Sequence, residues 1–316
     1  MAADFLQDPR VQGWLGGVEP AWTLLTFESL LALRHEPSAV QSAIQIANDL
    51  SVGEIAGSPV ARNTLILLGQ AIERVGLPLT ATGNLSRATV AEMCKLIEWP
   101  DYDQADAFRF NKVINEPDFL PLYVVRQLAQ AATLVRVRRG KLVATPLGKS
   151  ILSDAKRGSL LAVLFHLAFW RMDLSYFGRG LLGSWPQADA GVVLWSLSVC
   201  ANDWQSAEKL TRLCTIPEPA MFSETWDRTP YAMEAKILRP LLWFGLLEHR
   251  TEKVPSGRFG EHYFYRKAEL FDRLLAFDVQ VDLSERGSAL KAAASAARDF
   301  TRVRRGIAHP RHAAEH

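Results

Sequence analysis

Two glycine-containing motifs are the first candidates for chemistry in this sequence, because both could bind phosphates. Gly148-Lys149-Ser150 resembles the end of a Walker loop, but that loop needs a small residue five positions before Gly148, where Val143 stands. Residues 178–183 read GxGxxG, a fingerprint that must follow a strand, whereas here it follows a helical, aromatic stretch. We therefore interpret the first motif as a helix start after a hairpin, and the second as a connector.

Acidic residues offer a second kind of candidate, a cation site. Asp101, Asp103 and Asp106 lie close together, as in a calcium-binding loop. An EF-hand loop that started at Asp101 would need Gly at its sixth position and Glu at its twelfth, but Asp106 and Lys112 stand there. A solvated turn with helix-capping carboxylates is the preferred interpretation.

Histidines supply the remaining catalytic or metal-ligating candidates. His166 and Asp173 lie seven residues apart and could share a helix face as an acid–base pair, but no nucleophile stands in a recognisable turn near them. His309, His312 and His316 have a metal-compatible helical spacing, although they lie in a terminal tail. We expect no catalytic, metal or cofactor site, and an enzyme stays a third alternative because active sites assemble in space.

Positive charge is concentrated in two stretches of the chain. The whole sequence carries +2, residues 134–157 carry +6 and residues 284–316 carry +4, which leaves −8 on the rest. In the first stretch Arg136, Arg138, Arg139 and Lys141 crowd one predicted hairpin. Their mutual repulsion is relieved either by solvent or by a polyanion, and both interpretations stay open.

A tight hairpin positions these cations. Val135 and Val137 alternate with Arg136 and Arg138, which is the pattern of a half-buried strand. Residues 139–140 supply a two-residue reversal, residues 141–145 run back as a second strand, and a short helix follows. Upstream, residues 120–132 have helical periodicity.

A second stretch repeats this order of elements. Residues 192–200 and 203–214 are predicted helices, and a third helix begins at Thr229-Pro230, with Thr229 as its N-cap. Residues 245–253 and 260–270 alternate as two strands around a longer turn. The N-terminal segment is expected to be helical, including a helix that begins at Ser38 and carries Val40, Ile44 and Ala47 on one face.

Winged-helix domains have three helices followed by a hairpin, in the order predicted here for both stretches. The chain therefore resembles a tandem winged-helix protein. The resemblance implies a mainly α fold with small β-hairpins, two winged-helix-like units, and helical additions at both ends. The expected boundaries are a helical N-terminal extension (1–57), a first unit (58–155), a helical connector (156–187), a second unit (188–281), and a basic C-terminal helix and tail (282–316).

Winged-helix proteins include many bacterial DNA-binding regulators and many protein-interaction modules, so the resemblance implies either role. For DNA binding we expect basic side chains of both wings, of the second unit's third helix and of the C-terminal helix to contact phosphates. These residues are Arg136, Arg138, Arg139, Lys141, Lys236, Arg239, Arg250, Lys253, Arg258, Arg302, Arg304 and Arg305. The third helix of the first unit offers only Arg126, Gln127 and Gln130 for base contacts.

Composition limits the remaining possibilities. Hydrophobic content of 48% with 22% charged residues is globular, and Cys94, Cys200 and Cys214 fit a reducing cytoplasm because they form neither a disulfide framework nor a zinc set. No export signal or membrane-spanning run is seen. We expect a cytoplasmic, non-enzymatic protein that binds duplex DNA. The alternative is an interaction scaffold whose helical segments bind a protein partner or a second copy, without nucleic acid.

Overall fold

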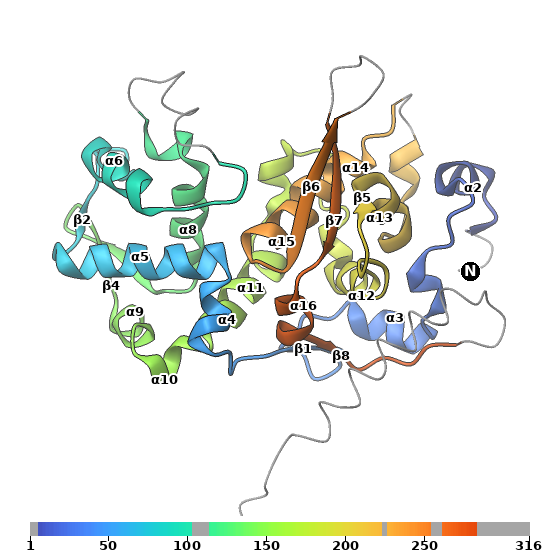
Figure 1. Ribbon diagram of the computed structural model, residues 1–316, viewed down its shortest axis with the longest axis horizontal. Coiled ribbons are helices and arrows are strands. Elements are labelled where there is room, and N and C mark those ends of the chain that lie inside the picture. The colour runs from blue at the N-terminus through green and yellow to red at the C-terminus, as the bar shows by residue number, and fades with distance from the viewer. Residues whose placement is uncertain (1–5, 103–113, 223–225, 254–260, 283–316) are drawn as a thin grey trace, which may run out of the picture.

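The computed structural model describes residues 6–102, 114–222, 226–253 and 261–282. In this part of the chain, helices dominate and small antiparallel sheets of two or three strands accompany them (Figure 1). This confirms the predicted fold class, mainly α with small β-hairpins. Two bodies follow each other along the long axis, and α11 (Leu160–Trp170) lies between them.

The first unit, residues 59–144, combines helices with a sheet in the strand order β2-β4-β3. Its elements are α5 (Pro59–Glu73), β2 (Leu77–Pro78), α6 (Arg87–Leu96), η2 (Glu116–Asp118), α8 (Leu120–Ala131), β3 (Val135–Arg138) and β4 (Lys141–Ala144). Ser58 caps α5 and Ser86 caps α6, because each side chain accepts a hydrogen bond from a backbone N–H of the first turn. Both helix starts are therefore stabilised by local hydrogen bonds.

The second unit, residues 190–267, has the same order of elements, and its sheet has the equivalent strand order β5-β7-β6. Its elements are α12 (Ala190–Cys200), β5 (Gln205–Ser206), α13 (Ala207–Cys214), α14 (Thr229–Met233), the π-helical turn η6 (Glu234–Leu238), α15 (Arg239–Trp243), β6 (Leu247–Lys253) and β7 (Glu261–Lys267). The third helix of this unit is therefore α14, η6 and α15 in sequence. It begins at Thr229, one residue before the predicted start, and Pro230 stands in its first turn.

Further elements precede, join and follow the two units. They are α2 (Pro9–Leu15), η1 (Ala21–Leu24), α3 (Phe27–Leu33), β1 (Ile44–Ile46), α4 (Val52–Ala56), α9 (Pro146–Ile151), α10 (Asp154–Arg157), η3 (Leu174–Gly178), η4 (Gln187–Asp189), α16 (Glu269–Leu274) and β8 (Leu275–Phe277). The short helix η5 (Pro219–Phe222) lies within the second unit. No helix among the described residues has both the length and the apolar character needed to cross a bilayer.

The predicted helix that starts at Ser38 is wrong. Residues 44–46 form β1, which pairs antiparallel with β8, so Ile44 lies opposite Phe277 and Ile46 opposite Leu275. Val40, expected on the buried face of that helix, is 97% exposed. The reason is tertiary: a strand more than 200 residues later supplies the backbone partners, and no local periodicity reports such a partner.

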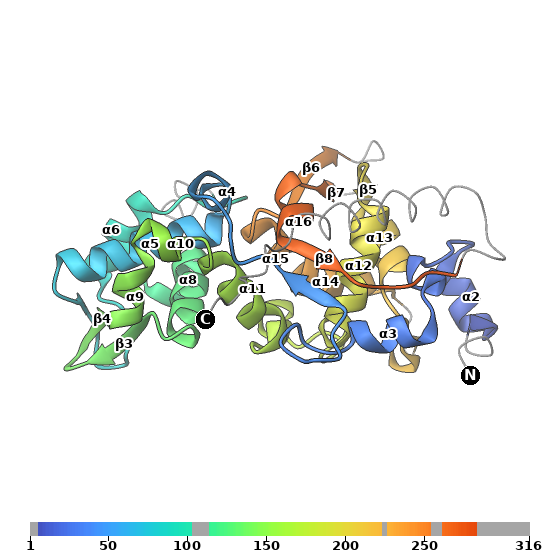
Figure 2. The ribbon, with the colours of Figure 1, turned by 90° about the horizontal axis from the view of Figure 1, so that it is seen from below.

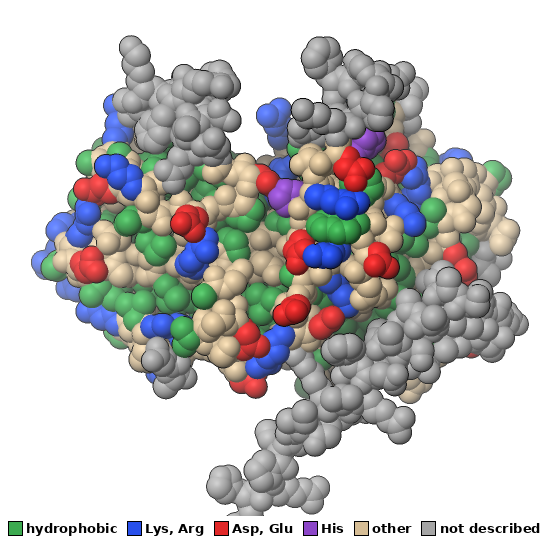
Figure 3. Space-filling model, in the orientation of Figure 1, with side chains coloured by type: hydrophobic (Ala, Val, Ile, Leu, Met, Phe, Trp, Pro, Cys, Tyr) green, Lys and Arg blue, Asp and Glu red, His purple; other side chains and the backbone are tan. Residues whose placement is uncertain are grey.

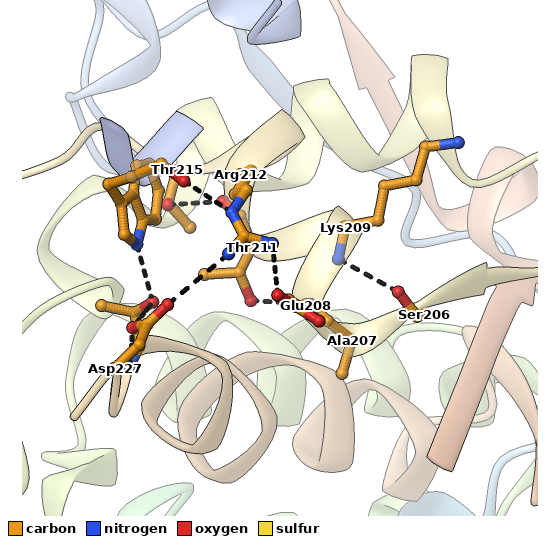
Figure 4. A network of polar contacts seen from close by, with 10 residues as sticks. Ser206, Ala207, Glu208, Lys209, Thr211, Arg212, Thr215 and Asp227 are labelled. Carbon is orange, nitrogen blue, oxygen red and sulfur yellow. Dashed lines mark hydrogen bonds and ion pairs between the residues drawn. The ribbon is translucent and has the colours of Figure 1, made fainter. Parts of the chain in front are cut away.

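The N-terminal segment packs on the second unit, as Figures 1 and 2 both show for α2 and α3. Arg212 of α13 is central to this contact (Figure 4). Its Nε donates to the Trp14 carbonyl at 2.7 Å, and its Nη1 pairs with Glu208 at 2.6 Å. The Trp14 indole donates to Thr229 Oγ1, and that hydroxyl donates to Asp227. The network fixes α2 against α13 and the start of α14.

Aromatic side chains join the two units into one hydrophobic core. Phe165 of α11 makes an edge-on contact with Phe244 of the second unit, with ring centroids 5.3 Å apart. Trp99 of the first unit lies against Trp243 at 5.7 Å. Gly245 approaches Gly57 so closely that a Cβ there would lie 2.5 Å from the Gly57 carbonyl oxygen. The buried interface indicates that the two units fold against each other.

Candidate nucleic-acid interface

The hairpin of the first unit forms as predicted. Val137 pairs with Leu142 and Arg138 with Lys141, so Arg136, Arg138 and Lys141 share the outer face of the sheet. Arg139 and Gly140 both have positive φ, 49° and 70°, which is the geometry of the two-residue turn that matches the twist of the strands. The outer face and the turn therefore carry all four cations.

The Gly-Lys-Ser motif holds the base of this hairpin. Gly148 lies in α9, and a Cβ at this position would lie 2.1 Å from the Leu134 carbonyl oxygen. The Thr145 hydroxyl accepts from the Gly148 N–H at 3.0 Å and donates to the Thr133 carbonyl at 2.7 Å. Close approach of α9 to β3 explains the glycine, and this agrees with the interpretation as a helix start.

The four hairpin cations are exposed and lie apart from the carboxylates that the structure describes. Arg136, Arg138, Arg139 and Lys141 all lie at the surface, and within the described residues no carboxylate forms an ion pair with any of them. Arg138 and Lys141 stand directly opposite each other on neighbouring strands, where like charges destabilise the pairing. An anion bound at this face would offset that repulsion.

The second hairpin differs because two of its arginines, Arg250 and Arg266, form ion pairs with carboxylates. Arg250 pairs with Glu252 at 3.0 Å, and Arg266 pairs with Glu248 at 2.6 Å. The two guanidinium groups also lie against the ring of Trp204, at 4.9 and 4.7 Å from its centroid. These contacts hold the side chains to the sheet surface, so the predicted phosphate contact of Arg250 competes with an existing ion pair.

The prediction that Lys236 binds nucleic acid is wrong, because its side chain is fully buried. Its ammonium donates to the carbonyl oxygens of Leu181 and Gly183 at 2.5 Å and of Trp185 at 2.7 Å. Desolvation lowers the pKa of Lys236 to about 8, while the Asp173 carboxylate opposes that change. The GxGxxG connector thus presents carbonyls to a lysine.

Arg126 of α8 is also engaged inside the protein. Its guanidinium pairs with the buried carboxylate of Glu116 at 2.5 Å and donates to the Gly83 carbonyl at 2.8 Å. The same Glu116 oxygen accepts from the Leu85 N–H. Arg126 is 6% exposed and Glu116 is 1% exposed. Sequence reasoning missed Glu116, because nothing in its neighbourhood distinguishes it from other acidic residues of the 101–118 connection.

The remaining predicted contacts are scattered or lie outside the described residues. Arg239 is exposed on α15. Lys253 ends β6, where its backbone pairs with Glu261. Outside the described residues lie Arg258, Arg302, Arg304 and Arg305, together with the tail histidines His309, His312 and His316.

The two hairpins do not form one continuous surface. In Figure 2 the β3–β4 hairpin lies at the lower left edge, whereas β6 and β7 lie at the upper edge of the other body. In Figure 3 Lys and Arg side chains gather along the left edge, the end of the first unit where Figure 1 places β2 and β4. Over β6 and β7, basic and acidic side chains are intermixed. The first hairpin is therefore the candidate site.

Other chemistry-bearing residues have structural roles. Asp101 lies 2.8 Å from His249 and joins the first unit to β6, and this carboxylate raises the pKa of His249. His166 lies 3.7 Å from Glu36. An open polar hollow of about 580 Å³ lies between residues 80–87 and 115–118, where Arg87 donates to Asn115. Among the described residues no three His, Cys, Asp or Glu side chains converge as metal ligands.

Comparison with known proteins finds similarity for the first unit. Residues 56–157 match the model of a family described as the Y4jL N-terminal domain. Over 120 residues the chain is 32% identical to the uncharacterized protein y4jL of Sinorhizobium fredii (strain NBRC 101917 / NGR234), which covers 38% of this chain and 54% of that protein. The chain thus spans about half the length of this relative, and no solved structure matches. The matched residues extend from α5 to α10 and include the whole basic hairpin.

Proposed function

We propose that this protein is a cytoplasmic, non-enzymatic protein that binds duplex DNA through the β3–β4 hairpin, in a regulatory or architectural role. One observation carries the proposal: Arg136, Arg138, Arg139 and Lys141 project from a two-stranded hairpin, and no carboxylate among the described residues pairs with any of them. The shared element order and strand order of the two units support the further proposal that both are winged-helix units, in which this hairpin is a wing.

The geometry of the hairpin suits contacts with successive phosphates. Arg136 and Arg138 are two residues apart on one strand and therefore about 7 Å apart. Lys141 lies across the sheet from Arg138, and Arg139 extends the charge to the turn. Each side chain that neutralises a phosphate releases condensed counterions, which supplies most of the affinity of such contacts.

The test is a salt series with a fluorescently labelled duplex, measured by anisotropy. For the native protein, the logarithm of the affinity is expected to fall linearly with the logarithm of salt concentration, by about 0.9 per phosphate neutralised. Replacing Arg136, Arg138 and Arg139 together with Ala is expected to reduce the slope by up to about 2.7. The circular dichroism spectrum of the triple variant should stay unchanged, because all three side chains are exposed.

Two control variants separate hairpin contacts from general electrostatic attraction. Lys at the same three positions keeps the charge and should keep the slope. Ala in place of the exposed Lys95, Arg179 and Lys209 removes the same charge elsewhere and should leave the slope nearly unchanged. No binding at low salt, or equal loss in both Ala triples, would contradict the proposal.

An interaction scaffold is the second candidate, and one observation favours it. Trp226 and Tyr231, beside and within α14, are 58% and 53% exposed, and their rings lie 5.1 Å apart. Exposed aromatic pairs of this kind are enriched at protein interfaces. If the hairpin fails the salt test, we propose that this pair marks a surface for a protein partner or a second copy.

A further inference from the structure

We infer that the hairpin binds duplex DNA independently of base sequence, an inference that rests on the proposed function. Reading bases requires side chains that reach base edges in a groove, usually from a helix that enters the major groove. The third helix of each unit would have to do this. In both units, most side chains of that helix are buried or bonded to other residues of the protein.

In the first unit, α8 has little exposed surface to place in a groove. It packs against α5, α6 and α11, and apart from Ala131 at its last position none of its residues is exposed. Arg126 is held by Glu116 and Gly83, and its Nε donates to Gln130. Two of the three side chains that could form hydrogen bonds with bases, Arg126 and Gln130, are thus committed to internal partners, which leaves the partly exposed Gln127.

In the second unit, the π-helical turn η6 places Lys236 inside the protein, where three carbonyls bind its ammonium. Along residues 229–243 only Tyr231 and Arg239 are exposed. They are eight residues apart with the buried η6 turn between them, and two isolated side chains do not form a reading surface. This unit therefore adds no ordered set of base contacts.

The hairpin itself is built for phosphates rather than for bases. A bidentate contact with guanine needs a guanidinium held in one plane, usually by a carboxylate or a carbonyl. Among the described residues nothing holds Arg136, Arg138 or Arg139 in this way. Freely rotating cations lose little by accepting phosphates from any direction, whereas ordering them on a base edge costs conformational entropy.

The experiment compares the affinity of the native protein for three duplexes of equal length, one AT-rich, one GC-rich and one of mixed sequence, in the same salt. We expect dissociation constants within about threefold of each other, because reading even one base pair changes affinity about fivefold or more. The triple Ala variant of Arg136, Arg138 and Arg139 should weaken all three complexes by the same factor.

Two results would overturn the inference. A random-sequence pool that yields an enriched motif, bound more than tenfold tighter than the mixed duplex, would show base reading. A consistent preference for the AT-rich duplex would show insertion of arginine into a narrow minor groove. Absence of binding to every duplex would instead overturn the proposed function, and the inference with it.

Discussion

Replacing Arg126 with Met is expected to lower the free energy of unfolding by about 3–5 kcal/mol. The substitution removes the guanidinium from Glu116, whose carboxylate is 1% exposed and cannot turn to water. The Gly83 carbonyl also loses its donor. Urea denaturation followed by circular dichroism measures the change.

A second substitution distinguishes loss of the partner from loss of the pair. Adding Glu116→Leu to Arg126→Met removes the uncompensated charge, so the double variant should be more stable than the Arg126→Met protein. Some cost remains, because the Leu85 N–H loses its acceptor. The exposed pair Arg171–Glu36, 2.9 Å apart, is the control, and Arg171→Met should change the stability by less than about 1 kcal/mol. Equal losses at Arg126 and Arg171 would contradict this account.

Replacing Lys236 with Met is expected to lower the free energy of unfolding by about 3 kcal/mol. Three carbonyls converge on the ammonium, those of Leu181, Gly183 and Trp185, and methionine has no hydrogen-bond donor to offer them. The loss is smaller than three separate hydrogen bonds because the desolvation of the ammonium is relieved at the same time. The measurement is denaturation at pH 7.

The pH dependence of the free energy of unfolding tests whether the buried ammonium of Lys236 causes the loss of stability in the Lys236→Met variant. Burial sets the pKa of Lys236 at about 8 in the folded protein, below its ordinary value of 10.5. Between these values the unfolded chain binds more protons than the folded protein, so the contribution of Lys236 to the free energy of unfolding rises with pH. This rise should be present in the native protein and absent in the Lys236→Met variant. A difference between the two proteins that does not change from pH 7.5 to 10 would contradict the buried position of the charge.

Elements stabilised by neighbours in the sequence were predictable. The β3–β4 hairpin is encoded by alternating residues and a two-residue turn, and α9 follows from Thr145 as its N-cap. The same holds for α5 and α6, whose Ser caps and first turns are local. In each case the hydrogen bonds that decide the structure form within a few residues, so the sequence pattern reports them.

Elements that depend on distant partners were not predictable. β1 exists because β8 pairs with it, and the helical spacing of Val40, Ile44 and Ala47 is coincidental. Lys236 and Arg239, three residues apart in the third helix, were both predicted to contact phosphates, but the π-helical turn between Glu234 and Leu238 changes the register. Helical periodicity assumes a regular helix, so it placed a buried lysine at the surface.

The candidate site was predictable only in part. The four cations of the first hairpin were found from their spacing, and their exposure agrees with that prediction. Arg266 pairs with Glu248 across the two strands, whereas Arg250 pairs with Glu252 on its own strand, and both guanidinium groups lie against Trp204. A count of charges along the chain does not contain this information, which explains why both hairpins were predicted as basic wings.

The most direct test of the proposed contact is photocrosslinking to duplex DNA. A benzoylphenylalanine at the hairpin turn (Arg139→benzoylphenylalanine) is compared with one at the exposed Thr251 of the second hairpin. We predict that the probe at the position of Arg139 crosslinks to DNA at moderate salt and that the probe at the position of Thr251 does not. Crosslinking from Thr251 alone, or equally from both positions, would contradict binding through the β3–β4 hairpin.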